Sequence, residues 1–300
     1  MIEAWILLSV MAALFQTLRF MLQKQLSMGR LSASGATFAR FFYAAPFAAA
    51  IAFGYLGWRG QGLPDLGGLF WPYVLTGGLA QILATWCVVA LFAERNFAVG
   101  ITFKKTEVVQ TALVGFVILG DRVSMAGLMA ILVGLVGVLV LSDTPASGHW
   151  SRRFVNRAAG LGLASGACFA ISAVAYRGAT LEVASEDAFL RAMLSVAAVT
   201  AAQSIAMALW LRWREPGQLG RVWAARGTAV WMGLTSVGGS VGWFTAFTLQ
   251  NAAYVFAVGQ VEVIFSMLAS VLFFRETISR REYIGIALLS ASILLLVLLG

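Results

Sequence analysis

The stretch TEVVQTALVGFVILGDRVS, at residues 106–124, recurs without a gap as VEVIFSMLASVLFFRETIS at residues 261–279. The two copies are 155 positions apart, and their alignment places Glu107 opposite Glu262. A carboxylate inside an otherwise apolar segment is rare, because burying its charge is costly. Two of them in register therefore indicate that one structural unit occurs twice in the chain.

Two further matches follow the same order along both halves. FAVG at residues 97–100 recurs at residues 256–259, at an offset of 159 positions. The first copy thus has four extra residues, about one helical turn, before its glutamate. Arg40 similarly corresponds to Arg191. The common order of these matches supports an internal duplication.

The composition places the chain in a membrane. Apolar residues make up 60% of the 300 positions and charged residues 11%, whereas soluble domains carry about 25% charge. A spanning helix needs about 20 mostly apolar residues. Ten segments satisfy this, near residues 2–22, 33–57, 69–92, 97–119, 123–141, 158–178, 187–210, 229–250, 254–274 and 283–299. We therefore predict one all-α membrane domain over residues 1–300.

The polar connection at residues 142–157 separates five predicted spans from five. We predict a first repeat at residues 1–141 and a second at residues 158–300. Because five is odd, the second repeat must enter the membrane upside down. Inverted repeats are typical of secondary transporters, which bind substrate near the membrane midplane. The expected fold is two inverted five-helix repeats around a central cavity.

The net charge of +8 does not indicate nucleic-acid binding, because the basic residues gather on one side of the predicted membrane. Thirteen lie in loops after odd-numbered spans, against Arg59, Arg122 and Arg177 after even-numbered ones. By the positive-inside rule the odd loops are cytoplasmic. Both termini then share the periplasmic side. The single histidine, His149, lies in a predicted loop, so we expect no cofactor, metal site or catalytic triad within the membrane.

Each repeat contains a helix that ends in an acidic residue before a short turn, at Asp121 in LGDRVS and at Glu276 in FRETIS. With ten spans in two halves, this pattern resembles the drug/metabolite transporter superfamily, EamA-type, with amino-acid exporters of the YddG kind the most similar members. The resemblance covers the whole chain and implies cytoplasmic termini, against the charge count. Many members have a proline where this chain has Thr106 and Val261, which argues against a proline hinge.

Polar residues concentrate in the fourth predicted span. Glu107 and Glu262 are predicted to bind a substrate ammonium group or to carry a proton; alternatively, Glu107 only neutralises a lysine. Lys104 and Lys105 are adjacent, so they point about 100° apart on a helix. One is predicted to bind a carboxylate or phosphate, and the other to pair with Glu107 or extend toward the interface.

Further candidates come from the remaining polar and aromatic positions inside the spans. Trp86 and Trp243 lie within their spans, whereas the other tryptophans lie at or near span ends, as membrane interfaces favour. Arg40 and Arg191 could bind substrate or extend to the interface, as could Arg19 near its span end. The remaining predicted substrate-binding residues are Gln16, Gln110, Gln260, Tyr43 and Tyr176.

This inventory combines both signs of charge with aromatic surfaces, which suits a zwitterion with an apolar side chain. We predict an inner-membrane exporter of small amphipathic metabolites, most suitably amino acids including aromatic ones. The direction of transport is implied by the resemblance alone. A carrier of phosphorylated metabolites or nucleotide sugars, and more distantly a membrane enzyme or receptor, remain alternatives. The fifth and tenth spans are almost purely apolar, so they can face lipid or form a homodimer.

Overall fold

The computed structural model describes residues 3–29, 31–91, 104–142, 157–265 and 280–299. Every element named within these ranges is an α-helix. The helices are α1 (Ala4–Gly29), α2 (Ala33–Arg59), α3 (Phe70–Leu91), α5 (Glu107–Leu119), α6 (Met125–Ser142), α8 (Arg157–Leu181), α9 (Ala188–Arg214), α10 (Gln218–Ala224), α11 (Arg226–Leu249), α12 (Ala252–Gly259) and α14 (Arg280–Leu299).

Five of the described helices are long and apolar enough to cross a membrane: α1, α2, α3, α8 and α9. The longest, α2 and α9, have 27 residues each, or about 40 Å at 1.5 Å per residue. The hydrocarbon core is about 30 Å thick, so these helices extend beyond it. The fold is thus all-helical with several membrane-spanning candidates. The short helix α10 was not predicted.

The first helix is longer than its apolar run. The sequence predicted a span ending near residue 22, but α1 continues to Gly29. Gln23 is fully buried and accepts a hydrogen bond from the Arg19 guanidinium at 2.9 Å. Its amide donates to the Ala36 carbonyl oxygen at 3.4 Å. Because Gln23 has partners inside the protein, the helix passes through this polar position, and Arg19 lies ten residues from the helix end.

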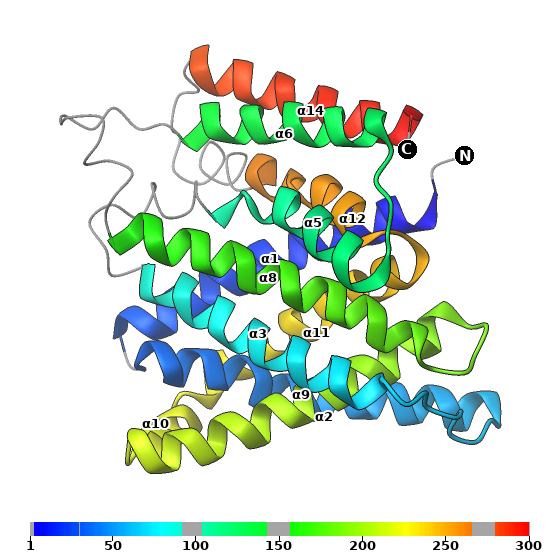
Figure 1. The fold of residues 1–300 in the computed structure, drawn as a ribbon. Helices are drawn as coiled ribbons and strands as arrows, with labels where there is room; N and C mark the ends of the chain where they lie inside the picture. Colours follow the sequence, from blue (N-terminus) through cyan, green and yellow to red (C-terminus); the bar gives the residue numbers. More distant parts are fainter. Residues whose placement is uncertain (1–2, 30, 92–103, 143–156, 266–279, 300) are drawn as a thin grey trace.

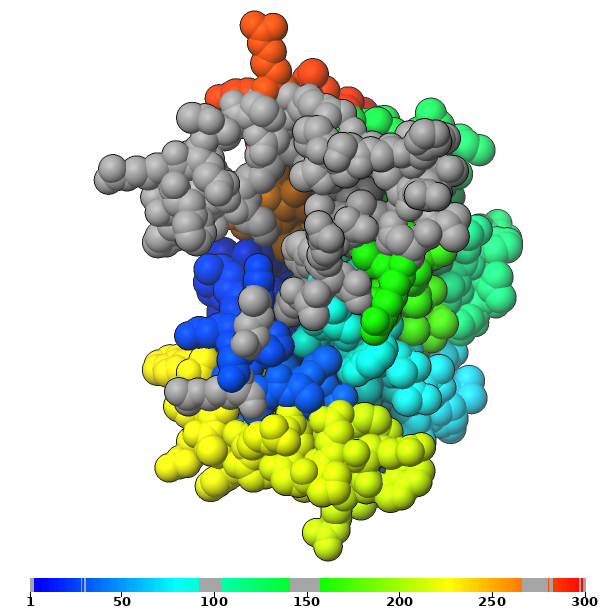
Figure 2. Space-filling model, turned by 90° about the vertical axis from the view of Figure 1, so that its left-hand side faces the viewer, coloured from blue at the N-terminus to red at the C-terminus, as the bar shows by residue number. Residues whose placement is uncertain are grey.

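Figure 1 shows the helices running side by side across the molecule. α6 and α14 form one edge, and α9 with α10 forms the opposite edge. α1 begins and α14 ends at the same end of the bundle. The other end, which faces the viewer in Figure 2, contains the turn from α9 through α10 to α11.

The closest helix pairs join the two halves of the chain. α3 packs against α8, α1 against α11, α2 against α9 and α6 against α14. α5 packs against both α8 and α12. Helices from residues 1–141 therefore interleave with helices from residues 158–300, and the core between them is shared.

Glycine allows α11 to approach its neighbours closely. A Cβ atom on Gly233 would lie 2.6 Å from the Tyr43 backbone of α2, and one on Gly242 would lie 2.9 Å from the Ala12 Cβ of α1. Contacts under 3.0 Å require a neighbour to move. Small residues at helix contacts are typical of membrane bundles, where van der Waals packing replaces hydrophobic attraction.

Candidate functional site

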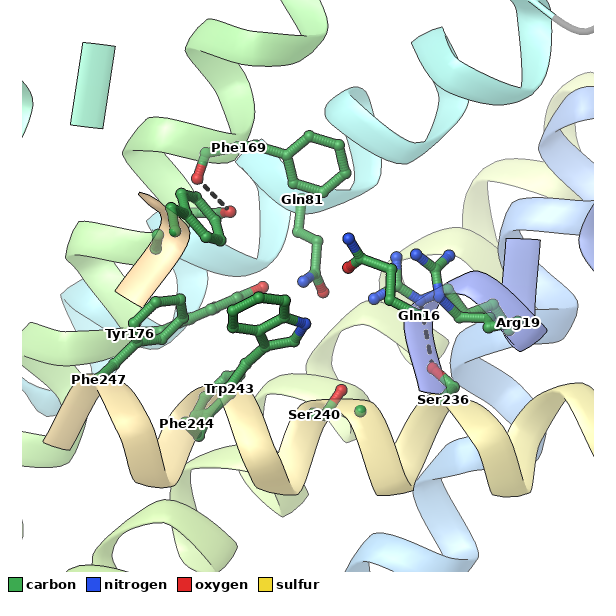
Figure 3. A pocket seen from close by; sticks show the side chains of 15 residues that line it. Gln16, Arg19, Gln81, Phe169, Tyr176, Ser236, Ser240, Trp243, Phe244 and Phe247 are labelled. Carbon is green, nitrogen blue, oxygen red and sulfur yellow. Dashed lines mark hydrogen bonds between the residues drawn. The ribbon is translucent and has the colours of Figure 1, made fainter. Parts of the chain in front are cut away.

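A cavity with an empty volume of about 450 Å³ lies among α1, α2, α3, α8, α11 and α12. Figure 3 shows its polar side chains on α1 and α3 facing an aromatic wall on α11. Its lining residues are Gln16, Arg19, Arg40, Gln81, Phe169, Ser172, Ala173, Tyr176, Ser236, Gly239, Ser240, Trp243, Phe244, Phe247 and Phe256. We refer to it as the main cavity. The helices that form it come from both halves of the chain.

Two helices present regular stripes to the main cavity. On α11 the lining positions are Ser236, Gly239, Ser240, Trp243, Phe244 and Phe247. On α8 they are Phe169, Ser172, Ala173 and Tyr176. Steps of three and four residues keep side chains on one helical face. The α11 stripe is polar toward Ser236 and aromatic toward Phe247, whereas the α8 stripe has an aromatic residue at each end and Ser172 between them.

Arg19 is one of two guanidinium groups in the main cavity. The residue is 2% exposed, and its Cζ lies 4.0 Å from the centroid of the Phe20 ring. Its Nη1 donates to Gln23, but the buried Nη2 has no hydrogen-bond partner among the described residues. The sequence suggested an interfacial position for Arg19. The longer α1 instead places it inside the bundle.

Arg40 is the second guanidinium group and is 5% exposed. Its Nε donates to the Ser236 hydroxyl at 3.2 Å, and its Nη1 donates to the Thr85 hydroxyl at 2.7 Å. Within the described ranges, neither Arg40 nor Arg19 has a carboxylate oxygen within 4.0 Å. The hydroxyls fix the direction of the Arg40 side chain without neutralising its charge. Extension to the interface, the alternative from the sequence, does not describe this buried residue.

Aromatic rings form the opposite wall. The Trp243 ring packs beside Phe247 at 6.0 Å and edge-on to Phe256 at 5.6 Å, while Tyr176 stacks on Phe244 at 4.3 Å. The Trp243 residue is 9% exposed, and its indole nitrogen has no hydrogen-bond partner among the described residues. Figure 3 shows this nitrogen facing the space beside the Gln81 side chain. The wall thus offers one unused donor within an apolar surface.

A smaller compartment of about 270 Å³ adjoins the main cavity. It shares Gln16, Phe169, Trp243 and Phe256 with the main cavity and adds Lys104, Glu107, Gly259, Gln260 and Glu262. We call it the ion-pair compartment. Its position brings the predicted Glu107 and Glu262 pair together beside the main cavity.

Each glutamate of this compartment is paired with a lysine. Lys104 Nζ lies 3.1 Å from Glu107 Oε1, and Lys105 Nζ lies 3.4 Å from Glu262 Oε2. The Gln16 amide also donates to Glu262 Oε2 at 2.9 Å. The first pair is local, whereas the second joins the two halves of the chain. Of the sequence alternatives for Glu107, the structure contains the lysine pairing.

The helices that contain these pairs are interrupted at corresponding positions. α5 begins at Glu107 after a turn at Lys105 and Thr106, and α12 ends at Gly259 before Gln260. Thr106 has φ −67° and ψ −7°, and Gln260 has φ −61° and ψ −13°. The 155-residue offset places these positions within one residue of each other. The interruptions occur although neither site has a proline.

One end of the main cavity is tied together by Arg177 of α8. Its Nε donates to Asp121 Oδ2 at 2.9 Å, and its Nη1 donates to the carbonyl oxygens of Phe247 at 2.6 Å and Gln250 at 2.9 Å. Phe247 also lines the cavity. Asp121, which the sequence marked at the end of a helix, is therefore connected through Arg177 of α8 to the end of α11. Glu276, its counterpart, lies outside the described residues.

Several predicted site residues lie elsewhere. Trp86 is 38% exposed on α3 and lines no cavity described above. Gln81 of the same helix faces the main cavity, and five residues correspond to about 500° of rotation, so Trp86 points about 140° away. Trp86 is thus not positioned as a second aromatic wall.

Three other candidates make contacts away from the main cavity. The Tyr43 hydroxyl of α2 donates to the carbonyl oxygen of Val222 in α10 at 3.3 Å. Arg191 Nε donates to the Thr180 carbonyl oxygen at 2.7 Å. The Gln110 amide donates to the Thr106 hydroxyl at 3.0 Å. These residues connect helices or stabilise the interrupted segment.

Sequence reasoning missed part of the lining. Gln81, Ser172, Ser236 and Ser240 were not singled out, nor were the phenylalanines, although they line the main cavity. The signal was present in the spacing, since Ser236, Ser240 and Trp243 lie on one helical face at steps of four and three. A search for polar stripes within apolar spans would have found them.

Comparisons with known proteins agree with this architecture. No curated protein matches the chain, whereas 29 chains of solved structures do. One, described as "Crystal structure of protein", has a TM-score of 0.67 and 19% identity, and the match covers 96% of this chain and 99% of that chain. At this identity the likeness concerns the fold alone. Residues 156–298 match the EamA-like transporter family. Over these residues the match confirms the EamA-type resemblance seen in the sequence, and together with the apolar helices it indicates a multi-pass membrane protein.

Proposed function

We propose that the chain is a secondary transporter that exports small amphipathic metabolites, with amino acids, including aromatic ones, as its substrate class. The observation that carries this proposal is the main cavity, which lies inside a membrane bundle and combines guanidinium groups with an aromatic wall. Membrane interiors favour apolar side chains, so charged groups gathered there indicate a path for a polar solute. The proposal places the substrate carboxylate near the arginines and its apolar side chain against the rings.

The packing of the helices supports two inverted repeats at residues 1–141 and 158–300. If the first span corresponds to the sixth and the third to the eighth, the contact of α3 with α8 is equivalent to that of α11 with α1. The same operation maps the pairs α2 with α9, and α6 with α14, onto themselves. Contacts exchanged in this way are expected of two halves related by an axis in the membrane plane.

Alternating access requires that one end of the cavity be closed while the other opens. The Arg177 cluster ties α8, the end of α11 and the turn after α5 at one end. We propose that these contacts break and re-form during transport. We place the protein in the inner membrane, with the opposite end, which contains the basic turn around α10, in the cytoplasm.

The edge formed by α6 and α14 suits contact with lipid or a second copy of the chain. Both helices are rich in exposed apolar side chains, such as Met125, Val136, Ile284 and Leu298. Among the described residues they pack mainly against each other and touch the other helices at few positions. We propose this edge as the face of a homodimer.

A second candidate function is the transport of phosphorylated metabolites. It is favoured by Arg19 and Arg40, which lack a described carboxylate partner. Guanidinium groups bind phosphate as well as carboxylate in a two-point geometry. The aromatic wall, which a sugar phosphate would not need, makes the amphipathic substrate the better match.

Uptake into liposomes tests the proposal. The purified chain is reconstituted and supplied with individual amino acids or sugar phosphates, with and without a pH gradient. Saturable uptake of aromatic and large apolar amino acids, absent from protein-free liposomes, is expected. Saturable uptake of sugar phosphates alone would favour the second function. Absence of uptake for all compounds would contradict both.

A further inference from the structure

We propose that Arg19, Arg40 and the Trp243 indole N–H form a seat for a carboxylate, and that the site accepts aromatic monocarboxylates that have no amino group. This inference rests on the proposed transport function and defines its substrate class more closely. It predicts that a des-amino acid binds at least as well as the corresponding amino acid.

The buried cations of the bundle differ in whether a carboxylate neutralises them. Lys104 and Lys105 are neutralised by Glu107 and Glu262. Arg19 and Arg40 line the main cavity without a carboxylate within 4.0 Å in the part of the chain that the structure describes. The charge of Glu262 acts on Arg19 only at longer range, and that carboxylate is already paired with Lys105. A buried cation without an anion in direct contact is costly, because it loses hydration and gains little compensating charge. An anionic ligand supplies what is missing.

The hydrogen-bond donors of the main cavity indicate the same kind of ligand. The Arg19 Nη2 group and the Trp243 indole N–H are buried and have no acceptor among the described residues. Buried donors are almost always paired, with protein, water or ligand. Indole N–H and guanidinium groups can only donate. The ligand must therefore bring acceptors, and the two oxygens of a carboxylate are suited to this role. Arg40 is held beside them by Ser236 and Thr85.

The described lining of the main cavity contains no anionic partner for the ammonium group of an amino acid. None of the described residues that line the main cavity is a carboxylate. The nearest carboxylates, in the ion-pair compartment, are already paired with Lys104 and Lys105. An ammonium group would thus lie near two guanidinium charges and gain no anionic partner. Its removal should leave binding unchanged or improve it, since like charges repel.

The aromatic wall defines the rest of the ligand. Trp243, Phe247 and Phe256 form a packed cluster on one side of the cavity, and Tyr176 stacks on Phe244 beside it. A phenyl or indole ring would bury apolar surface there. An aromatic ring joined to a carboxylate by a short chain matches both the wall and the seat.

Three compounds with the same ring separate the contributions. Phenylalanine, 3-phenylpropanoate and 2-phenylethylamine are titrated against the purified full chain, and binding is followed by calorimetry. The acid without an amino group should bind as tightly as phenylalanine or more tightly. The amine should bind at least about tenfold more weakly, because it loses a charged hydrogen-bond partner.

Variants test the seat itself. Arg40→Met and Arg19→Met should each weaken 3-phenylpropanoate by about tenfold or more. Arg40→Lys keeps the positive charge, so it controls for misfolding caused by loss of that charge. It should retain only part of the binding, because a lysine cannot donate two parallel hydrogen bonds as a guanidinium does. Arg226→Met is the matched control: it removes an exposed arginine at the start of α11 and should leave affinity unchanged.

The outcomes distinguish the two proposals. Binding of phenylalanine without binding of 3-phenylpropanoate would overturn the carboxylate seat and leave the transport of amino acids standing. Equal binding of all three compounds would also overturn it, because an apolar wall alone would explain that result. Absence of both binding and uptake for every compound would overturn the proposed function itself.

Discussion

The ion pair between Lys105 and Glu262 joins the two halves of the chain, and the substitution Glu262→Gln tests how much this pair stabilises the fold. The variant keeps an amide oxygen as an acceptor for Gln16, which now donates at 2.9 Å. It removes the carboxylate 3.4 Å from Lys105, whose side chain is 5% exposed. Lys105 makes this one ion pair among the described residues. The change therefore leaves a buried ammonium group without a described counter-charge.

The expected loss of stability follows from this burial. Removing one partner of a buried ion pair costs about 3–5 kcal/mol. The Glu262 side chain keeps 14% exposure, so solvent screening brings the expected loss in the free energy of unfolding to about 3 kcal/mol. The double variant Lys105→Met with Glu262→Met should recover most of this, because replacing a whole buried pair by apolar residues is nearly neutral.

The measurement is reversible unfolding in mixed micelles, followed by tryptophan fluorescence, together with uptake into liposomes. Glu262→Gln should lose most transport. If the double variant regains stability but not transport, Glu262 acts on the substrate or on a proton. If it regains both, the pair is structural. A Glu262→Gln variant within about 0.5 kcal/mol of the wild type would refute the reasoning.

Three further predictions can be checked independently. Trp243→Phe should abolish the change in fluorescence on binding substrate and weaken affinity about tenfold, whereas Trp86→Phe should do neither; the reverse pattern would exclude the Trp243 wall. Burial raises the pKa of Asp187, but the Tyr55 hydroxyl, two backbone N–H groups of α9 and Arg59 together hold that pKa below its ordinary value. The stability that Asp187 provides is thus present above about pH 4 and lost as the pH falls further. Asp187→Ala should lower the free energy of unfolding by about 1 kcal/mol near neutral pH, while Asp187→Asn, which can still cap α9, should lower it less. Equal losses in the two variants would contradict the capping role. A reporter that fluoresces only in the cytoplasm, fused to the C-terminus, should stay dark if the basic loops are cytoplasmic; strong fluorescence would favour the orientation implied by the superfamily.

Five of the ten predicted spans correspond to described helices that are long and apolar enough to cross a membrane, because each is a run of apolar residues bounded by polar ones. The predicted span at residues 158–178 corresponds to α8 (Arg157–Leu181), and that at 33–57 to α2 (Ala33–Arg59). The end of α1 could not be predicted in this way. Gln23 interrupts the apolar run but is satisfied by Arg19 and by a carbonyl of α2, contacts that exist only after folding.

The site was predicted in part for the same reason. Charged residues within apolar runs stand out, so Lys104, Glu107 and Glu262 could be singled out. A lysine partner for Glu107 was among the alternatives, whereas the contact of Lys105 with Glu262 was not predicted. Which residues face a common cavity depends on helix rotation. Trp86 and Trp243 look alike in the sequence, yet one is 38% exposed and the other 9%. Their different environments arise from how α3 and α11 pack.

The interruptions beside Lys105 and Gln260 have a further consequence, because no proline enforces them. At Gln260 the bonds from Gln260 N–H to the Ala257 oxygen and from Val263 N–H to the Gln260 oxygen span three residues instead of four. Every backbone amide there keeps its hydrogen and can return to the α-helical pattern. A proline would fix the irregular geometry in every state of the protein. In this chain the irregular backbone geometry is maintained by neighbouring contacts, including the lysine–glutamate pairs on either side. Charge neutralisation and backbone shape are therefore coupled at this point, and a solute that disturbs one pair would also alter the course of the helix that bears it.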